Sequence, residues 1–323
     1  MNSSLAEEAV EVGDVLRESI AGAGGVDLLR RAVDDPGVRR VAGDLVDAVG
    51  LWDLEPLADP LQLEVAAAAS QAAGFYALPY PVAERFARCG EADATAVVGE
   101  EASALVAHGD LPLAWAGVDP SGRTHRLAPA SDALGTKIAP FAVEMTLHPT
   151  GERSPQTAAL GITLQSWWLL GLLEHAAADT VQYTREREQF GRRLISFQGV
   201  GFQLADMAVA VEALGELGKY TLWRIATAGD GALVDAVALR SAAQAAASTV
   251  LRGAHQLHGA MGFTDEVDVS WLSRASQLVR RLPEGAHSTA GRLVTLIDAG
   301  GWADFGSADA PRTDRTEESV RYA

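Results

Sequence analysis

Two stretches in the second half of the sequence carry residue types that suit a phosphate group and a flat heterocycle. The first, residues 185–191, places Arg187 shortly before Phe190. A guanidinium can form two parallel hydrogen bonds to a pyrophosphate, and an aromatic ring can lie against a heterocycle. A solvated arginine followed by a phenylalanine that anchors a core would have the same sequence. This stretch alone therefore leaves both alternatives open.

The second stretch, residues 256–263, lies at the end of a predicted helix. Gly259 and Gly262, with Ala260 between them, keep bulky side chains away from the backbone, so that backbone N–H groups can approach a phosphate. The amide of Gln256 can add a donor and an acceptor. A helix C-cap glycine followed by a turn glycine would have the same sequence, and both alternatives again remain open.

Other catalytic or metal-binding patterns are weak. The sequence contains no GxSxG, GxxxxGK[ST] or HExxH motif. Glu284-x-x-His287 has the spacing of a di-iron ligand pair, but such a site needs a second pair and two further glutamates. His255-x-x-His258 has no carboxylate partner nearby in sequence. We therefore predict no metal site.

Long helices must position the two stretches. From Thr157 to Leu257, apolar residues recur at steps of three or four in three segments, and a fourth segment covers residues 282–297. Four such helices in succession predict an antiparallel bundle over residues 152–300. The first stretch then lies in the loop after the first helix, and the second at the end of the third helix.

The rest of the chain divides into three further regions. An Ala-rich run and its flanking prolines predict an N-terminal helical domain over residues 1–92. Short apolar runs bounded by Gly, Pro and Asp predict a reduced β segment over residues 93–151. The fold class is thus mainly α, and residues 301–323 form a polar tail. Strands are expected within Thr95–Val98, Ala104–His108, Leu113–Val118 and Phe141–Leu147.

Composition excludes several classes of protein. The 323 residues include 26 basic and 43 acidic side chains, a net charge of −17, which disfavours binding to nucleic acid or to anionic membranes. The hydrophobic share of 48% with 21% charged residues is typical of a globular protein. The single cysteine, Cys89, cannot form an internal disulfide, and the sequence has no secretory signal or membrane span. We therefore expect a cytoplasmic protein.

Together the two stretches resemble the C-terminal bundle of the acyl-CoA dehydrogenase flavoprotein family. Their order and spacing fit over about residues 157–296, with Gly171 at the family's helix glycine. The matching residues are Arg187-x-Gln189-Phe190-Gly191, Phe197-Gln198, Leu204-Ala205-Asp206-Met207 and Gln256-x-x-Gly259-x-x-Gly262.

The resemblance implies an oxidoreductase that uses FAD to introduce an α,β double bond into an acyl-CoA thioester. A carboxylate removes the α-proton, and the β-hydrogen leaves as a hydride. It also implies that one side of the bundle end contacts the adenosine-pyrophosphate half of an FAD held mainly by a neighbouring subunit. The cofactor-binding residues would be Arg187, Gln189, Phe190, Gln198, Gln256, Gly259, Ala260 and Gly262.

The chain departs from the family in three places. Nothing in residues 93–151 matches the motifs that cradle the flavin ring. Members of the family are usually longer than this chain, and most of the difference in length falls in this region. Gly161 and Ile162 occupy the positions of an alternative base and a CoA-binding arginine. The commoner base falls on Pro283, with Glu284 one residue later. Glu284 is either a general base whose pKa an apolar pocket raises, or a first-turn acid favoured by the helix dipole.

These departures leave three functional hypotheses. A homo-oligomer could use Glu284 as its base. The chain could instead pair with a fuller acyl-CoA dehydrogenase chain (α2β2), complete the FAD site of that partner and rely on its base; the departures favour this version. Such pairing resembles the shortened chains of bacterial heterotetrameric steroid-CoA dehydrogenases, which implies lipid metabolism, steroid degradation and an acceptor of the electron-transfer flavoprotein type. The alternative is a non-catalytic helical assembly or scaffold protein that binds no flavin.

Overall fold

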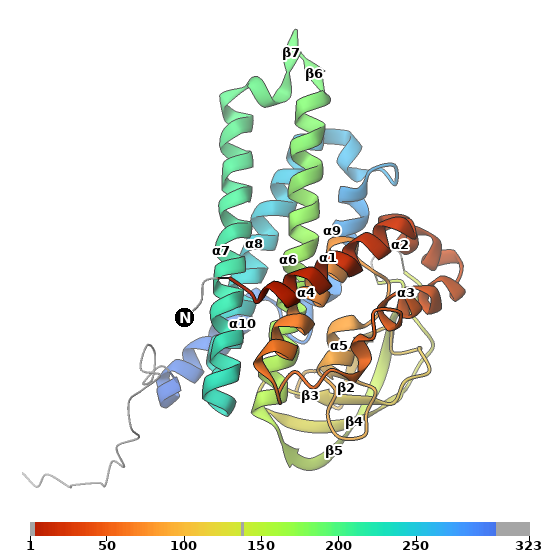
Figure 1. The fold of residues 1–323 in the computed structure, drawn as a ribbon, viewed down its shortest axis with the longest axis vertical. Coiled ribbons are helices and arrows are strands. Elements are labelled where there is room, and N and C mark those ends of the chain that lie inside the picture. Colours follow the sequence, from red (N-terminus) through yellow and green to blue (C-terminus); the bar gives the residue numbers. More distant parts are fainter. Residues whose placement is uncertain (1–3, 137–138, 302–323) are drawn as a thin grey trace, which may run out of the picture.

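The computed structural model describes residues 4–136 and 139–301, and it is mainly α-helical, as the sequence predicts. A helical group from the N-terminal part, a small sheet and a bundle of long helices pack against one another (Figure 1). Apart from Gly301, the predicted polar tail lies outside the described residues. None of the helices within the described ranges is long and apolar enough to cross a membrane.

Five helices precede the sheet. The longest inner one, α4, begins where Asp59 caps it: the carboxylate accepts the backbone N–H groups of Leu61 and Gln62, and Pro60 takes the first helical position. Its alanines are buried and allow α1 and α6 to approach closely. The helices are α1 (Glu7–Gly22), α2 (Val26–Asp34), α3 (Gly37–Asp47), α4 (Pro60–Phe75) and α5 (Val82–Phe86), with a 3-10 turn, η1, at Leu51–Asp53.

The middle segment is a five-stranded sheet with the order β1-β3-β4-β5-β2. β1 and β3 are parallel, and the other neighbouring strands are antiparallel. Four of the strands overlap the predicted apolar runs, whereas β4 was not expected because polar side chains dominate it. The strands are β1 (Ala94–Val97), β2 (Ser103–Ala107), β3 (Trp115–Val118), β4 (Arg123–Pro129) and β5 (Ala142–Arg153).

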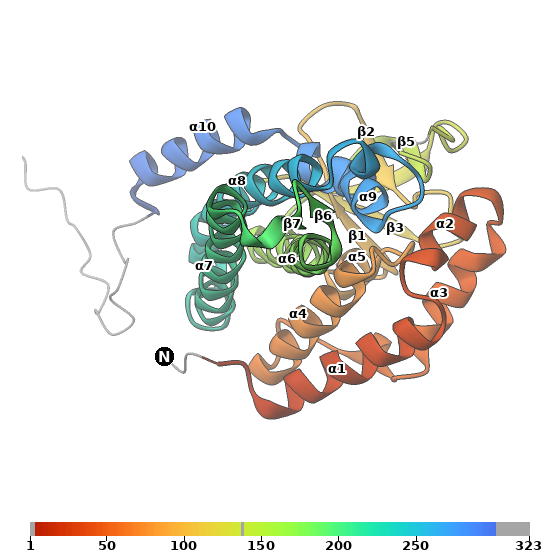
Figure 2. The ribbon, with the colours of Figure 1, turned by 90° about the horizontal axis from the view of Figure 1, so that it is seen from above.

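The C-terminal part is the predicted antiparallel bundle (Figures 1 and 2). α6, α7 and α8 run up, down and up: a small hairpin joins α6 to α7 at one end, and a 3-10 turn joins α7 to α8 at the other. The elements are α6 (Pro155–Glu186), β6 (Glu188–Gln189), β7 (Arg192–Arg193), η2 (Leu194–Ser196), α7 (Gln198–Ala228), η3 (Gly229–Ala232), α8 (Leu233–His258), η4 (Gly259–Phe263), α9 (Asp268–Arg281), α10 (Ala286–Leu296) and η5 (Ile297–Gly301).

The fourth helix of the bundle differs from the one expected. A helix does lie within residues 282–297, as α10, but it packs on the outer side of α8 (Figure 2). The position beside α6 and α8 belongs to α9, whose residues the sequence pattern did not single out. α9 buries Val269 and Leu272, and Ala275 and Val279 pack partly buried against the core, so an apolar stripe at helical spacing does occur in its sequence.

Two glycines allow α4 and α6 to cross in backbone contact. A Cβ atom on Gly74 would lie 1.8 Å from the carbonyl oxygen of Trp168, and one on Gly171 would lie 2.0 Å from that of Gln71. Real Cβ atoms do not approach backbone atoms so closely, so any larger residue must push the two helices apart. This crossing joins the N-terminal helices to the bundle.

We predict that Gly171→Ala lowers the free energy of unfolding by roughly 3 kcal/mol or more, because the backbones cannot separate without disturbing the buried faces of both helices. Urea unfolding measures the change. Gly215→Ala in α7 is the control: its Cβ would meet Leu170 at an ordinary 3.8 Å, so it should stabilise the helix slightly. Equal effects of the two substitutions would contradict the close crossing.

Candidate functional site

The cofactor-binding residues predicted from the sequence gather at one end of the bundle. Arg187 ends α6 and leads into the hairpin, while Gln256 lies in the last turn of α8 beside η4. Both segments lie at the top of Figure 1. Seven of the eight predicted residues are exposed and Gly262 is buried, so this end of the bundle is an open surface rather than a pocket within the chain.

The hairpin presents an aromatic side chain at considerable local strain. Phe190 and Gly191 form its two-residue turn, with φ angles of +57° and +76°. Such a turn favours Asn-Gly, because both residues must have positive φ. Phe190 nevertheless occupies the first position, and 89% of it is exposed. A residue held in an unfavourable conformation with its ring in solvent is typical of a recognition surface.

The second stretch forms a tight turn after α8. Gly259 has φ +60° and ψ −135°, a conformation that glycine alone adopts easily. A Cβ on the buried Gly262 would lie 3.1 Å from the Cβ of His258, so the turn folds back on the helix end. Ala260 remains exposed between them. The turn thus offers backbone at the surface, as a phosphate-binding turn requires.

Glu284 lies far from these residues along the chain, in the loop between α9 and α10. Its carboxylate accepts a hydrogen bond from Nε of Arg292 at 2.8 Å, and the side chain is 15% exposed. The loop backbone is held from α8: Arg240 and Gln244 donate to the carbonyl of Glu284. The immediate neighbour of the Glu284 carboxylate is thus a guanidinium rather than the apolar wall that the base hypothesis expects. Its role as a base remains a prediction.

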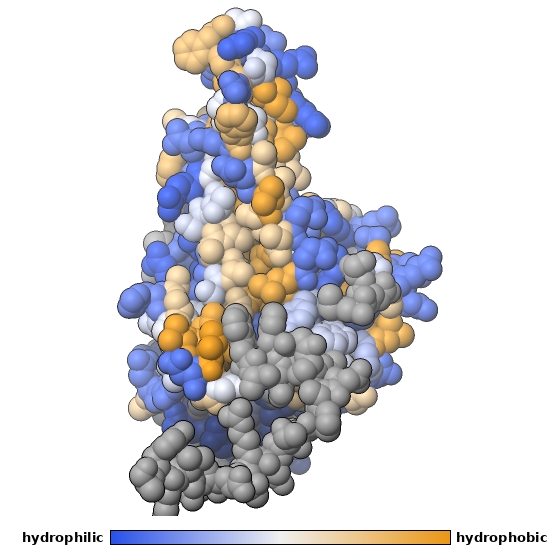
Figure 3. Space-filling view, turned by 90° about the vertical axis from the view of Figure 1, so that its left-hand side faces the viewer, coloured by the Kyte–Doolittle hydropathy of each residue, from blue (hydrophilic) through white to orange (hydrophobic). Residues whose placement is uncertain are grey.

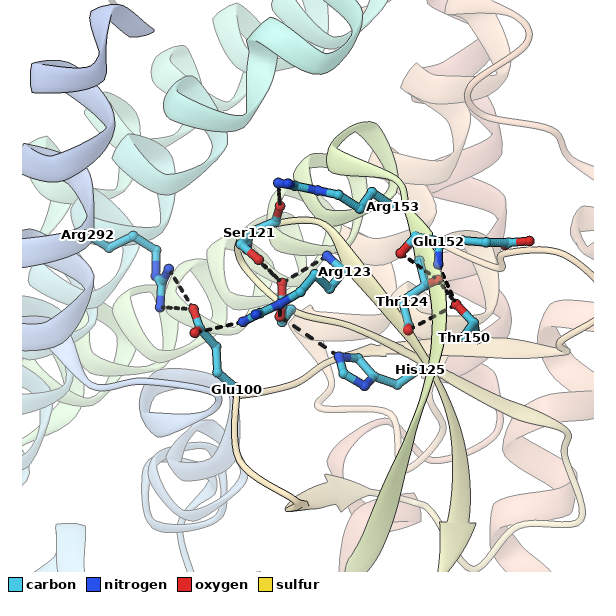
Figure 4. A network of polar contacts seen from close by, with 10 residues as sticks. Glu100, Ser121, Arg123, Thr124, His125, Thr150, Glu152, Arg153 and Arg292 are labelled. Carbon is cyan, nitrogen blue, oxygen red and sulfur yellow. Dashed lines mark hydrogen bonds and ion pairs between the residues drawn. The ribbon is translucent and has the colours of Figure 1, made fainter.

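Arg292 also belongs to a chain of charged side chains that leads from α10 to the sheet (Figure 4). Its Nη1 lies 3.4 Å from Glu100, Glu100 lies 2.8 Å from Arg123, and Nε of Arg123 lies 2.7 Å from Asp119. Asp119 is fully buried. Burial alone would raise the pKa of Asp119, but hydrogen bonds from Ser121 and Arg123 hold it below its usual value. The chain ties α10 to the sheet.

The interior near the loop that carries Glu284 has little free space. Leu282, at the start of the loop, borders a cavity of about 30 Å³ between α5, α6, α9 and the sheet. A neighbouring cavity holds about 80 Å³. Both contain Glu84, which accepts a 3.0 Å hydrogen bond from Gln165, and burial raises the pKa of Glu84. The two cavities have room for a few water molecules each.

A larger cavity of about 630 Å³ lies beside the charge chain. Its lining is mixed: four carboxylates and two arginines lie beside the apolar side chains of Ala102, Leu147 and Pro149. In the described part of the chain, no group of three or more His, Cys, Asp or Glu side chains is placed to hold a metal ion.

Sequence analysis missed the buried pairs that support these sites. Glu84 and Gln165 are distant in sequence, and Asp119 gave no motif. In the sequence, His258 stands out only as part of the His255-x-x-His258 spacing. In the structure its ring packs against Tyr183 and faces Asp179 on α6. The spacing of Asp179 and Tyr183, four residues apart on one helix, is the signal that could have suggested a shared partner.

Residues 162–294 match the family model described as the C-terminal domain of acyl-CoA dehydrogenases. This segment of the chain is therefore similar in sequence to an acyl-CoA dehydrogenase C-terminal domain. The short-chain-specific acyl-CoA dehydrogenase of Megasphaera elsdenii is 31% identical over 173 residues, which is 54% of this chain and 41% of that protein. The mitochondrial short-chain enzyme of Bos taurus is 30% identical over 145 residues, 44% of this chain and 32% of that protein. The chain thus aligns with less than half the length of these relatives.

Solved structures of acyl-CoA dehydrogenases share the fold over most of the chain. A chain of the ChsE4-ChsE5 complex from Mycobacterium tuberculosis superimposes with a TM-score of 0.76 at 21% identity, covering 92% of this chain and 99% of that one. Butyryl-CoA dehydrogenase from Megasphaera elsdenii gives 0.65 at 15% identity, covering 92% of this chain and all of that one. At these identities the likeness concerns the fold.

We predict that Asp119→Asn makes stability less dependent on pH in the acid range. Because the folded pKa of Asp119 is lowered, its stabilising effect is present above its unfolded pKa of about 4 and is lost as pH falls through the folded value. Urea unfolding of both proteins between about pH 7 and pH 3 should show a difference that shrinks at the acid end. Parallel curves would contradict the lowered pKa.

Proposed function

We propose that this chain is a subunit of an FAD-dependent acyl-CoA dehydrogenase that introduces an α,β double bond into an acyl-CoA thioester. In this proposal the chain completes the FAD site of a partner chain and the partner supplies the base. The observation that carries the proposal is the exposed, strained Phe190 beside Arg187 at the end of a bundle of this family. A strained backbone and an exposed aromatic ring both lower stability, and a ligand or partner that binds at this surface explains why they are kept.

The surface along the bundle supports a partner chain. Apolar residues form a band down the face of α7 below the hairpin (Figure 3). Phe202 is 62% exposed and Val209 is 68% exposed on this helix. Exposed apolar side chains that continue from the hairpin onto a helix face are typical of a subunit interface.

The surroundings of Glu284 support a base on the partner. Its carboxylate is paired with Arg292, and the cavity beside its loop holds only about 30 Å³. A general base must lie within hydrogen-bond reach of the proton that it removes, and a cavity of this size leaves no room for an acyl chain beside the loop. FAD, when bound, supplies the hydride acceptor; Arg187 and Gln256 would hold its pyrophosphate from this chain.

The similar structures suggest the kind of partner and substrate. The ChsE4-ChsE5 structure is a complex of two chains, and a second similar structure, with a TM-score of 0.69 at 20% identity and covering 92% of this chain, is described as the Tcur3481-Tcur3483 steroid acyl-CoA dehydrogenase. We extend both features to this chain as part of the proposal: a second acyl-CoA dehydrogenase chain, and a bulky acyl group such as a steroid side chain. The electrons would pass to an acceptor of the electron-transfer flavoprotein type.

Co-purification with candidate acyl-CoA dehydrogenase chains tests the proposal. We predict that FAD appears with the complex and that Arg187→Met lowers the affinity of the complex for FAD by roughly tenfold to a hundredfold, because a charge-assisted contact is lost. Visible flavin absorbance and a fluorescence titration measure this. Arg185→Met, an exposed arginine two residues earlier, is the control and should bind FAD normally.

Three outcomes distinguish the alternatives. A flavin-free preparation from every combination would favour the non-catalytic scaffold. FAD bound to this chain alone would contradict the paired version. Equal FAD affinity of the Arg187→Met and Arg185→Met complexes would remove Arg187 from the site.

The identity of the base has its own test. We predict that Glu284→Gln in the complex leaves the steady-state turnover of acyl-CoA within about twofold of the wild type, since its carboxylate serves the ion pair with Arg292. Loss of a true general base would lower turnover by about a hundredfold or more. Arg292→Met, which removes the same ion pair from the other side, is the matched control. A collapse of turnover in Glu284→Gln alone would restore Glu284 as the base.

A further inference from the structure

A buried histidine joins the two stretches at the end of the bundle. His258 is the last residue of α8, is 3% exposed and directly precedes the glycine turn. Its ring stacks on Tyr183 of α6 at 4.3 Å between centroids, with an angle of 21° between the planes. Tyr183 lies four residues before Arg187, where α6 ends and the hairpin begins. The stack of His258 on Tyr183 thus connects the end of α6, where the hairpin begins, with the end of α8, where the glycine turn begins.

Both ring nitrogens of His258 face oxygen atoms. Nδ1 lies 2.9 Å from the carbonyl oxygen of Ala254, one turn earlier on the same helix. Nε2 lies 3.5 Å from a carboxylate oxygen of Asp179 on α6. The first contact holds the ring to its own helix, and the second holds α8 to α6. Of the two nitrogen contacts, only that of Nε2 joins α8 to α6, and it acts alongside the ring stack and the 3.5 Å hydrogen bond from the hydroxyl of Tyr183 to the carbonyl oxygen of His258.

The turn beyond His258 is fastened to the same point. A Cβ atom built on Gly262 would lie 3.1 Å from the Cβ of His258, so the backbone of the turn lies close to this residue. The neighbouring His255 stacks on Phe263, the last residue of the turn, at 4.9 Å. The turn therefore packs directly against the end of α8 that carries His258. An ordered spacing between these segments is what a ligand bridging both would need.

We propose that His258, held by Asp179, is a positioning residue that fixes the glycine turn against the arginine hairpin, and so sets the shape of the surface that receives the pyrophosphate of the cofactor. This inference rests on the proposed function, since the cofactor is the one that function requires. His258 itself is buried and acts through the turn that follows it.

Two amide substitutions separate the contacts of His258. The amide of Asn reaches the position of Nδ1 and can keep the bond to Ala254, whereas the amide of Gln reaches the position of Nε2 and can keep the contact with Asp179. We expect His258→Gln in the complex to bind FAD within about twofold of the wild type, and His258→Asn to bind roughly tenfold more weakly. Asp179→Ala should match His258→Asn. Urea unfolding of each variant confirms that it is folded.

Spin labels measure the positioning without any cofactor. In a Cys89→Ser background, labels at Glu188→Cys in the hairpin and Met261→Cys in the turn report the distance between the two segments by double electron–electron resonance. We expect one narrow distribution for the wild type and for His258→Gln, and a broadened or shifted one for His258→Asn.

The outcomes distinguish this inference from the proposed function. Unchanged distance distributions and unchanged FAD affinity in His258→Asn and Asp179→Ala would overturn the positioning role while leaving the function intact. A wild-type complex without FAD would overturn the proposed function, and with it the purpose assigned to His258. Equal losses in the Gln and Asn variants would show that the ring stack on Tyr183, rather than Asp179, is what matters, and would overturn the inference as stated.

Discussion

The backbone contact between α4 and α6 at Gly74 and Gly171 is the constraint on which the rest of the structure depends. α6 is the central helix: it contacts α4 and α5 on one side and α7, α8 and α9 on the other. Because the crossing leaves no room for a side chain, it determines how far α6 projects beyond the N-terminal helices. The hairpin follows that projecting end of α6, so the position of Arg187 and Phe190 depends on the helix crossing at Gly74 and Gly171.

Charge is used differently at the two ends of the bundle. At the hairpin end, arginines and an aromatic ring remain exposed in a protein whose net charge is −17. Near the sheet, Arg292 and Arg123 are each shared between two carboxylates, and the charges offset one another. The arginines at the hairpin can therefore attract an anion, over a distance that screening limits to about 10 Å. Beside Glu284, the arginines are already paired with carboxylates of the same chain. The proposed binding surface therefore lies at the hairpin end, and no proton transfer is proposed at Glu284.

Much of the fold could be predicted from the sequence, because long helices repeat their apolar residues many times. α6, α7 and α8 each bury a continuous stripe, and the exposed cofactor stretches follow from where those helices end. β4 was missed because it has few apolar side chains and depends on its neighbours for burial, whereas α9 was missed although Val269, Leu272 and Val279 recur at helical spacing. The environment of Glu284 could not be predicted at all: Arg292 is eight residues away, but Glu100 comes from the other half of the chain.

The central claim is that this chain contributes part of an FAD site whose remainder lies on another chain. A structure of the co-purified complex with FAD tests it most directly, through the distance between the guanidinium of Arg187 and the cofactor phosphates. We expect hydrogen-bond distance, about 3 Å, between the guanidinium and a phosphate oxygen, with the flavin ring held by the partner. A flavin enclosed entirely within one chain, with Arg187 in solvent, would contradict it.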